Sequence, residues 1–238
     1  MKGLIIRFFV SLSLLTTYSN YPQILLINNN YIQSNQQVKI VDNVYNEKEN
    51  YFEINLSIPS IQELENSDKQ NDINSKIALD TNIRVDNFKN ISNEYYKNMP
   101  PPYMPFQFFS KYFVTNKSEI ISFYIDYYQF TGGAHGITDR IAYNINSFTG
   151  EEIRLKDLFT EETDYKSIID QEIQRQISKS PEGFFTGKDG FLGIKEGQKF
   201  YIKDNKIVIY FDLYEIAPYA MGIPEFTIES NIFGIKEY

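Results

Sequence analysis

The single histidine of this 238-residue chain lies at position 135, inside the stretch TGGAHG of residues 131–136. An imidazole can act as a general base, as a metal ligand or as a hydrogen-bonding group in a loop. A nucleophilic triad needs a serine and an acid beside the histidine, and the sequence has no Gly-x-Ser-x-Gly elbow. A zinc or iron site needs several clustered ligands, which one histidine with scattered carboxylates does not supply.

The three glycines of this stretch predict a connection between two strands. Gly132, Gly133 and Gly136 permit positive φ or a close backbone approach. The ring nitrogens of His135 can then satisfy buried carbonyl groups. We interpret the stretch as a structural turn, with a contact surface as the alternative, and we expect no catalytic residue, no metal and no cofactor.

Acidic residues gather between positions 151 and 164. Two carboxylates at the right separation can hydrolyse a glycosidic bond, and Glu151 with Asp157 is the candidate pair. Acids near the start of a helix are also stabilised by the helix dipole. We favour a solvated helix start, so we expect that the chain is not an enzyme and keep glycan hydrolysis as the rival.

The loop YEIAPYAMGIPEF, residues 214–226, carries large apolar groups on an irregular segment. Proline stiffens this loop, and rigid aromatic loops are typical of binding hot spots. The alternative is that these side chains plug the end of a sheet. The candidate binding residues are Tyr214, Pro218, Tyr219, Met221 and His135.

The elements that position these residues follow from the periodicity of the first half of the chain. Two alternating runs, 38–45 and 51–58, predict a hairpin. Apolar residues then recur at helical spacing, and Ser67 with Gln70 forms a capping box, so we expect a helix over 67–97. Consecutive prolines end it, and we place a module boundary there.

Aromatic strands dominate the second half. Runs 106–116, 118–130 and 139–150 predict an antiparallel meander, and an apolar stripe over 165–177 predicts a second helix, capped by Thr160 or Thr163. A hairpin at residues 204–205 and a last strand follow. With no parallel βαβ alternation, the fold class is α+β, with two small modules that each pack an antiparallel sheet with one helix.

This pattern divides the chain into three parts. Residues 1–36 form a lead-in, 37–102 an N-terminal module and 103–238 a C-terminal module. Lys2 and Arg7 with an apolar run through Leu15 resemble a secretory signal peptide or an uncleaved anchor. A buried strand or helix is the alternative for this run.

Charge and cysteine content narrow the classes of partner. The net charge of −8 argues against nucleic acid and favours a basic partner. With no cysteine, the chain has no disulfide, thiol nucleophile or zinc-cysteine site. Secreted proteins without cysteine are common enough that export stays open.

Three stretches together resemble one family. The TGGAHG segment, AYNINSFTGEEIRLKDLF at 142–159 and FYIKDNKIVIYFDLYEIAPYAMGIPEFTI at 200–228 resemble the C-terminal module of the extracytoplasmic domain of RsiV-type anti-sigma factors. The upstream stretch EINLSIPSIQELENSDKQNDINSKI at 53–77, continuing to NEYYKNM, resembles the companion module of these proteins, which also precedes the PdaC-type peptidoglycan deacetylase domain. The resemblance covers residues 38–232.

That resemblance implies an α+β ectodomain outside the bacterial membrane. It implies a lysozyme receptor, with Pro218 and Tyr219 on the partner-binding face. PdaC-type deacetylation requires a metal held by several histidines, which one histidine cannot provide. A lead-in of 36 residues is short for both a sigma-binding segment and a membrane helix.

We therefore expect a non-catalytic binding or sensing module of the envelope, secreted or tethered to the membrane through its N-terminus. Its expected partner is a basic protein such as lysozyme, or a cell-wall glycan. Beside the glycan hydrolase, a structural accessory domain that binds no free ligand is the third hypothesis.

Overall fold

The computed structural model describes residues 38–98 and 104–229. These residues all lie in one compact unit, Gln36–Tyr238. The predicted signal peptide or anchor at 1–36 lies outside the described residues. Within the described ranges, no helix combines the length and the apolar character that a membrane crossing requires.

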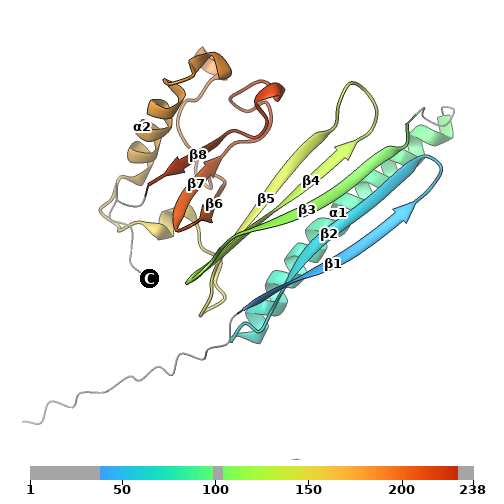
Figure 1. Cartoon of the computed structure of the whole chain (residues 1–238), viewed down its shortest axis with the longest axis horizontal. Coiled ribbons are helices and arrows are strands. Elements are labelled where there is room, and N and C mark those ends of the chain that lie inside the picture. Colours follow the sequence, from blue (N-terminus) through green and yellow to red (C-terminus); the bar gives the residue numbers. More distant parts are fainter. Residues whose placement is uncertain (1–37, 99–103, 230–238) are drawn as a thin grey trace, which may run out of the picture. The chain divides into compact units, whose positions relative to one another are not determined.

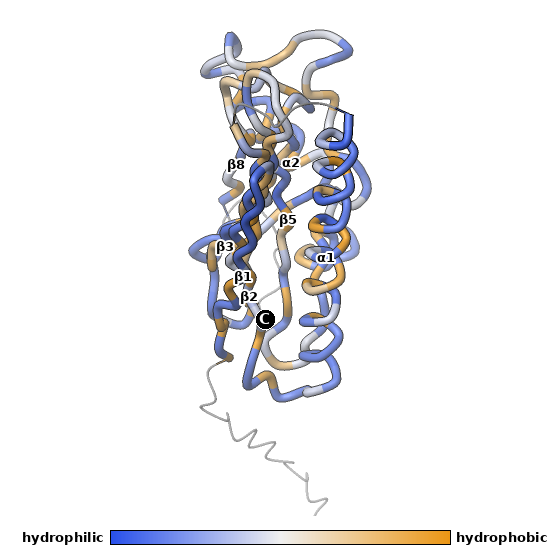
Figure 2. Tube along the Cα trace, turned by 90° about the vertical axis from the view of Figure 1, so that its right-hand side faces the viewer, coloured by the Kyte–Doolittle hydropathy of each residue, from blue (hydrophilic) through white to orange (hydrophobic). Residues whose placement is uncertain are grey.

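The larger sheet has five strands that follow one another in chain order. One long helix, α1 (Ser67–Asn98), runs along one face of this sheet, as Figures 1 and 2 show. The predicted hairpin, helix and meander are therefore confirmed. The strands are β1 (Lys39–Lys48), β2 (Phe52–Gln62), β3 (Phe106–Lys117), β4 (Ile120–Phe130) and β5 (Ile137–Asn146).

One pairing in this sheet is parallel, so the expectation of purely antiparallel sheets with no parallel βαβ unit is wrong here. β2 runs parallel to β3, with Phe52 opposite Phe106, and α1 is the crossover between them. Parallel strands are usually recognised by continuous apolar runs because both faces are buried. Here apolar and polar residues alternate along the strands, because α1 covers only one face of the sheet. The continuous apolar run that would indicate a parallel strand is therefore missing.

The predicted module boundary at residue 102 does not coincide with the division between the sheets. β2 and β3 lie on either side of residues 99–103 in the chain and pair with each other. The larger sheet is complete only at the end of β5, and the second sheet follows it. The division into modules 37–102 and 103–238 stays a prediction about domains.

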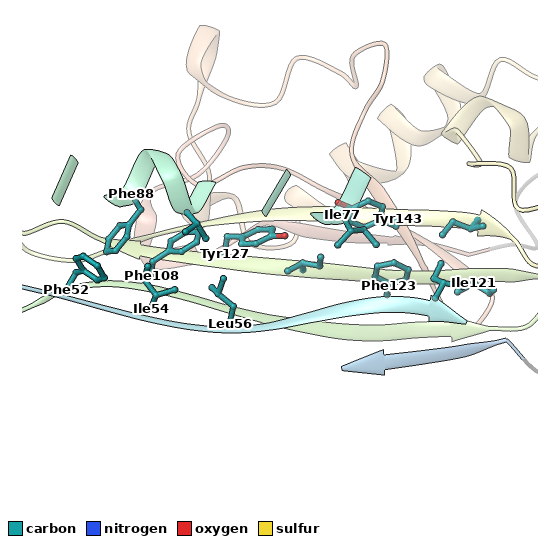
Figure 3. Packing of buried hydrophobic residues seen from close by; sticks show 14 of the residues in the cluster. Phe52, Ile54, Leu56, Ile77, Phe88, Phe108, Ile121, Phe123, Tyr127 and Tyr143 are labelled. Carbon is teal, nitrogen blue, oxygen red and sulfur yellow. The ribbon is translucent and has the colours of Figure 1, made fainter. Parts of the chain in front are cut away.

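The core of the larger sheet lies under α1 (Figure 3). The helix turns a stripe at spacings of three and four toward the sheet, which includes Ile77, Thr81 and Phe88. Thr81 also shares a hydrogen bond with the Tyr127 hydroxyl, at 2.7 Å, so this buried polar pair is satisfied. Ile91 is 45% exposed because it lies at the edge of the buried face.

Both helix starts differ from the predicted caps. At α1 the side chain of Asn66, not Ser67, accepts the hydrogen bond from the backbone N–H three residues on. At α2 (Tyr165–Ile177) Asp164 takes this role. Thr160 and Thr163, the predicted caps, bond to each other instead, at 2.8 Å.

The smaller sheet contains three antiparallel strands, β6 (Phe200–Lys203), β7 (Lys206–Tyr210) and β8 (Glu225–Ile228). Asp204 and Asn205 both have positive φ, of 50° and 60°, which suits the tight β6–β7 hairpin. α2 buries Ile169, Ile173 and Ile177 in the second core, so the α+β class with two sheets and two helices is confirmed. The short helices are η1 (Leu155–Leu158), η2 (Pro181–Gly183), η3 (Gly187–Asp189) and η4 (Tyr219–Met221).

β6 packs against the face of the larger sheet that α1 leaves open. The Ser122 hydroxyl on β4 accepts a hydrogen bond from the backbone N–H of Ile202, at 2.9 Å. Asn144 on β5 donates to the carbonyl of Phe200, at 3.0 Å. Buried polar side chains of the larger sheet thus satisfy the backbone of the smaller one, which fixes how the following loops are held.

Candidate binding surface

Two loops that lie far apart in the sequence meet at one surface. The first joins β4 to β5 and contains residues 131–136, and the second joins β7 to β8 and contains residues 211–224. The ring of His135 stacks on the ring of Tyr219, with centroids 3.8 Å apart and an angle of 16°. The Tyr219 hydroxyl donates to the carbonyl of Gly136, at 2.9 Å. We call this region, formed by His135, Tyr214, Pro218, Tyr219 and Met221, the aromatic loop surface.

Both ring nitrogens of His135 are engaged. Nδ1 lies 3.0 Å from the carbonyl oxygen of Gly136, which can only accept, so Nδ1 carries the proton. Nε2 lies 3.2 Å from the Tyr214 hydroxyl. The imidazole therefore connects the two loops.

The glycines of the first loop have two different roles. Gly132 and Gly133 have φ of +95° and +91°, a conformation that side chains disfavour. Gly136 instead lies against β4, where an added Cβ would be 2.4 Å from the Tyr128 ring and 2.6 Å from the carbonyl of Gln129. The loop therefore needs glycine at 136 for space and at 132 and 133 for backbone shape.

The second loop presents some of its large side chains to solvent, while Ile216 and Ala217 are buried. Tyr214 is 49% exposed and Met221 is 46% exposed, and Pro218 is exposed beside them. Tyr214 also has a φ of +66°, which is rare for a bulky side chain. Strain of this kind persists where the surrounding structure fixes the residue, often at a functional site.

A groove of about 490 Å³ adjoins the surface at Tyr214. The segment FFTGKDGFLG, residues 184–193, forms much of its wall, and Leu192 there is 78% exposed. Asp170 on α2 anchors this segment by accepting from the backbone N–H of Ile194, at 2.7 Å. This groove was not predicted from the sequence, although the segment has three glycines among aromatic residues, the same signal as the TGGAHG stretch.

Glu151 and Asp157, the candidate catalytic pair of the rival hypothesis, each form an ion pair with a basic side chain. Glu151 lies 3.0 Å from the Lys69 ammonium. The Arg154 guanidinium donates two hydrogen bonds to Asp157 and its backbone N–H donates a third, and these bonds lower the pKa of that carboxyl. A general acid needs a raised pKa, so Asp157 is tuned in the opposite direction. In the part of the chain that the structure describes, no three histidine, cysteine or acidic residues come together as metal ligands.

Two family models match the chain, and the division between them falls between the two loops, at residues 139–155. Residues 45–138 match the family model "Deacetylase PdaC", and residues 156–231 match "Protein of unknown function (DUF3298)". The first loop of the aromatic loop surface lies in the PdaC match and the second in the DUF3298 match.

Two curated proteins of Bacillus subtilis are similar in sequence. Anti-sigma-V factor RsiV is 27% identical over 194 residues, which cover 78% of this chain and 66% of RsiV. Peptidoglycan-N-acetylmuramic acid deacetylase PdaC is 26% identical over 113 residues, which cover 44% of this chain and 23% of PdaC. The chain therefore spans just under two thirds of RsiV and about a quarter of PdaC.

Two solved structures share the fold. A DUF3298-family protein from Bacteroides fragilis has a TM-score of 0.63 at 18% identity, with 83% of this chain and 92% of that chain covered. A DUF3298-family protein from Pseudomonas aeruginosa has a TM-score of 0.51 at 13% identity, with 84% and 97% covered. The chain thus joins a PdaC-like segment to a DUF3298-like segment, is similar in sequence to RsiV over 78% of its length, and shares its fold with solved DUF3298-family proteins.

Proposed function

We propose that this chain is a non-catalytic extracytoplasmic binding module of the bacterial envelope, secreted or membrane-anchored, and that the aromatic loop surface contacts its partner. The observation that carries the proposal is the joining of His135, Tyr214 and Tyr219 from two loops at an exposed surface. Half-exposed tyrosine and methionine held on rigid loops are typical of the centre of a binding site.

The proposed partner is a basic protein, with lysozyme as the candidate that the resemblance implies. The net charge of −8 attracts a cationic protein and speeds encounter with it. The similarity to RsiV, an anti-sigma factor, supports a sensing role. The similarity to PdaC, a peptidoglycan deacetylase, supports a location near peptidoglycan.

Calorimetric titration of the purified chain with lysozyme tests this proposal. Tyr214→Ala and Met221→Ala remove exposed groups, and each should weaken binding about tenfold or more, the scale of a hot-spot residue. Phe148→Ala is the matched control, because Phe148 is 53% exposed on a different turn. If the parent chain does not bind, lysozyme is excluded as the partner. If Phe148→Ala loses as much affinity as the other two variants, the aromatic loop surface is excluded as the contact site.

Binding to a cell-wall glycan is the alternative for the same surface, and a glycan hydrolase is the rival. Incubation with purified peptidoglycan separates them. The proposal predicts no released fragments, whereas release that disappears in Asp157→Asn would establish the hydrolase. If neither lysozyme nor peptidoglycan binds, the structural accessory role becomes the better hypothesis.

A further inference from the structure

The two edge strands of the larger sheet, β1 and β5, differ in whether other residues of the chain bond to their free edges. On β5 the hydroxyl of Tyr210 accepts from the backbone N–H of Ala142 and donates to the carbonyl of Arg140, both at 3.2 Å. Farther along, residues 151–153 form two backbone hydrogen bonds with the end of β5. The free edge of β5 is therefore closed by the polypeptide itself.

β1 has no comparable cover among the described residues. It pairs with β2 alone, over ten residues in continuous register with no bulge. Natural edge strands are usually protected by proline, bulges, short length or charge. The centre of β1, residues 43–46, has none of these, and it exposes Val44 at 66% and Tyr45 at 44%.

We propose that β1 pairs antiparallel with β1 of a second copy of this chain, which joins two five-stranded sheets into one. Symmetry restricts how this can happen. A two-fold axis perpendicular to the sheet keeps each side chain on its own face, so opposite residues must belong to the same face. The axis must then pass through a residue and not between two residues.

An axis through Asn43 gives complementary neighbours among the odd-numbered residues, whereas on the other face Asp42 lies opposite Val44 and Ile40 opposite Asn46. Lys39 then lies opposite Glu47, and Val41 lies opposite Tyr45, each pair occurring twice. Pairs of opposite charge and pairs of an aromatic with a β-branched residue are those that stabilise antiparallel sheets. Lys39 and Glu47 each form an ion pair within the chain, and the new contacts would add to these.

The neighbouring register lacks this complementarity. An axis through Val44 places Val41 opposite Glu47 and Ile40 opposite Lys48, so apolar groups face charges. An extended peptide from another protein would need no self-complementary sequence. The pattern of β1 therefore favours a second copy of this chain as the occupant of the edge.

Cysteine cross-linking tests the register directly, because the chain contains no cysteine. Asn43→Cys places two thiols opposite each other on the axis, where opposite Cα atoms of an antiparallel pair are about 4.5–5.5 Å apart, within disulfide range. Asn46→Cys, on the same exposed strand, is the control, because its opposite residue is Ile40. Mild oxidation of the 238-residue chain should yield at least about tenfold more disulfide-linked dimer from Asn43→Cys.

Light scattering of the unmodified chain supplies a second measurement that does not depend on a variant. The proposal predicts a mass that rises from monomer toward dimer with protein concentration. A constant monomer mass, or equal cross-linking of the two cysteine variants, would overturn it. Capture of extended peptides by a chain that stays monomeric would also count against it.

Discussion

Tyr219 shows how single residues hold the aromatic loop surface together. Its ring stacks on His135 and its hydroxyl bonds to the backbone of the other loop, so it is partly buried. Tyr214 contacts the same histidine from the solvent side. The sequence named both tyrosines, His135 and the glycines as candidates from residue type. It did not show that they meet, because contact between loops 79 residues apart depends on how the two sheets pack.

Removing each hydroxyl separates these two roles. Tyr219→Phe should lower the free energy of unfolding by about 1 kcal/mol, because the buried Gly136 carbonyl loses one donor. Tyr214→Phe should change it by less than about 0.5 kcal/mol, because this bond is exposed. Urea denaturation of the two variants measures the difference, and equal losses would contradict the assigned roles.

At the scale of elements, α2 is held to β8 by a short polar network. Gln176 donates to the carbonyl of Thr227, at 2.8 Å, and to Glu172, at 2.7 Å. Arg175 also donates two hydrogen bonds to Glu172, whose side chain is 11% exposed. The hydrogen bonds from Arg175, assisted by Gln176, lower the pKa of Glu172 from 4.5 to about 2.

This network predicts a dependence of stability on pH. Because the folded state lowers the pKa of Glu172, its contribution is complete above pH 4.5 and is lost as pH falls toward about 2. Glu172→Gln should cost about 1 kcal/mol near neutral pH, since Arg175 is exposed and solvent screens the pair. Denaturation curves of parent and variant should converge at low pH, and a constant difference would refute this origin.

Elements with strong periodicity, and antiparallel strands joined by short turns, were predictable from the sequence, whereas the pairing across α1 was not. The predicted helix over 67–97 is α1, Ser67–Asn98, because its apolar positions repeat at helical spacing. The caps were wrong by one residue at α1, since Asn66 competes with Ser67 for the same role. The parallel β2–β3 pair has no local signal, because it depends on where α1 returns the chain.

At the scale of the whole molecule, Arg140 links the two sheets. It lies on β5 with a side chain only 9% exposed, and it pairs with Asp126 of β4 and Glu225 of β8. Its guanidinium lies 3.7 Å from the ring centroid of Tyr124, in a cation–π contact. The loop before β8 carries Tyr214 and Tyr219, so this link helps to place the aromatic loop surface.

Loss of this link should destabilise the fold strongly. Arg140→Met leaves the Asp126 carboxylate, which is only 20% exposed, without its partner and should cost about 3 kcal/mol. Glu225→Gln is the milder comparison, at about 1 kcal/mol, because Glu225 is 39% exposed. Thermal and chemical denaturation check both values, and a loss in Arg140→Met no larger than that in Glu225→Gln would contradict the role of Arg140.

Hydrogen–deuterium exchange of the chain with and without lysozyme tests most directly that the aromatic loop surface is a docking site. We expect slower exchange in residues 131–136 and 211–224 when lysozyme is present, with little change along α1. Unchanged exchange in both loops, or protection confined to other elements, would contradict the proposed site.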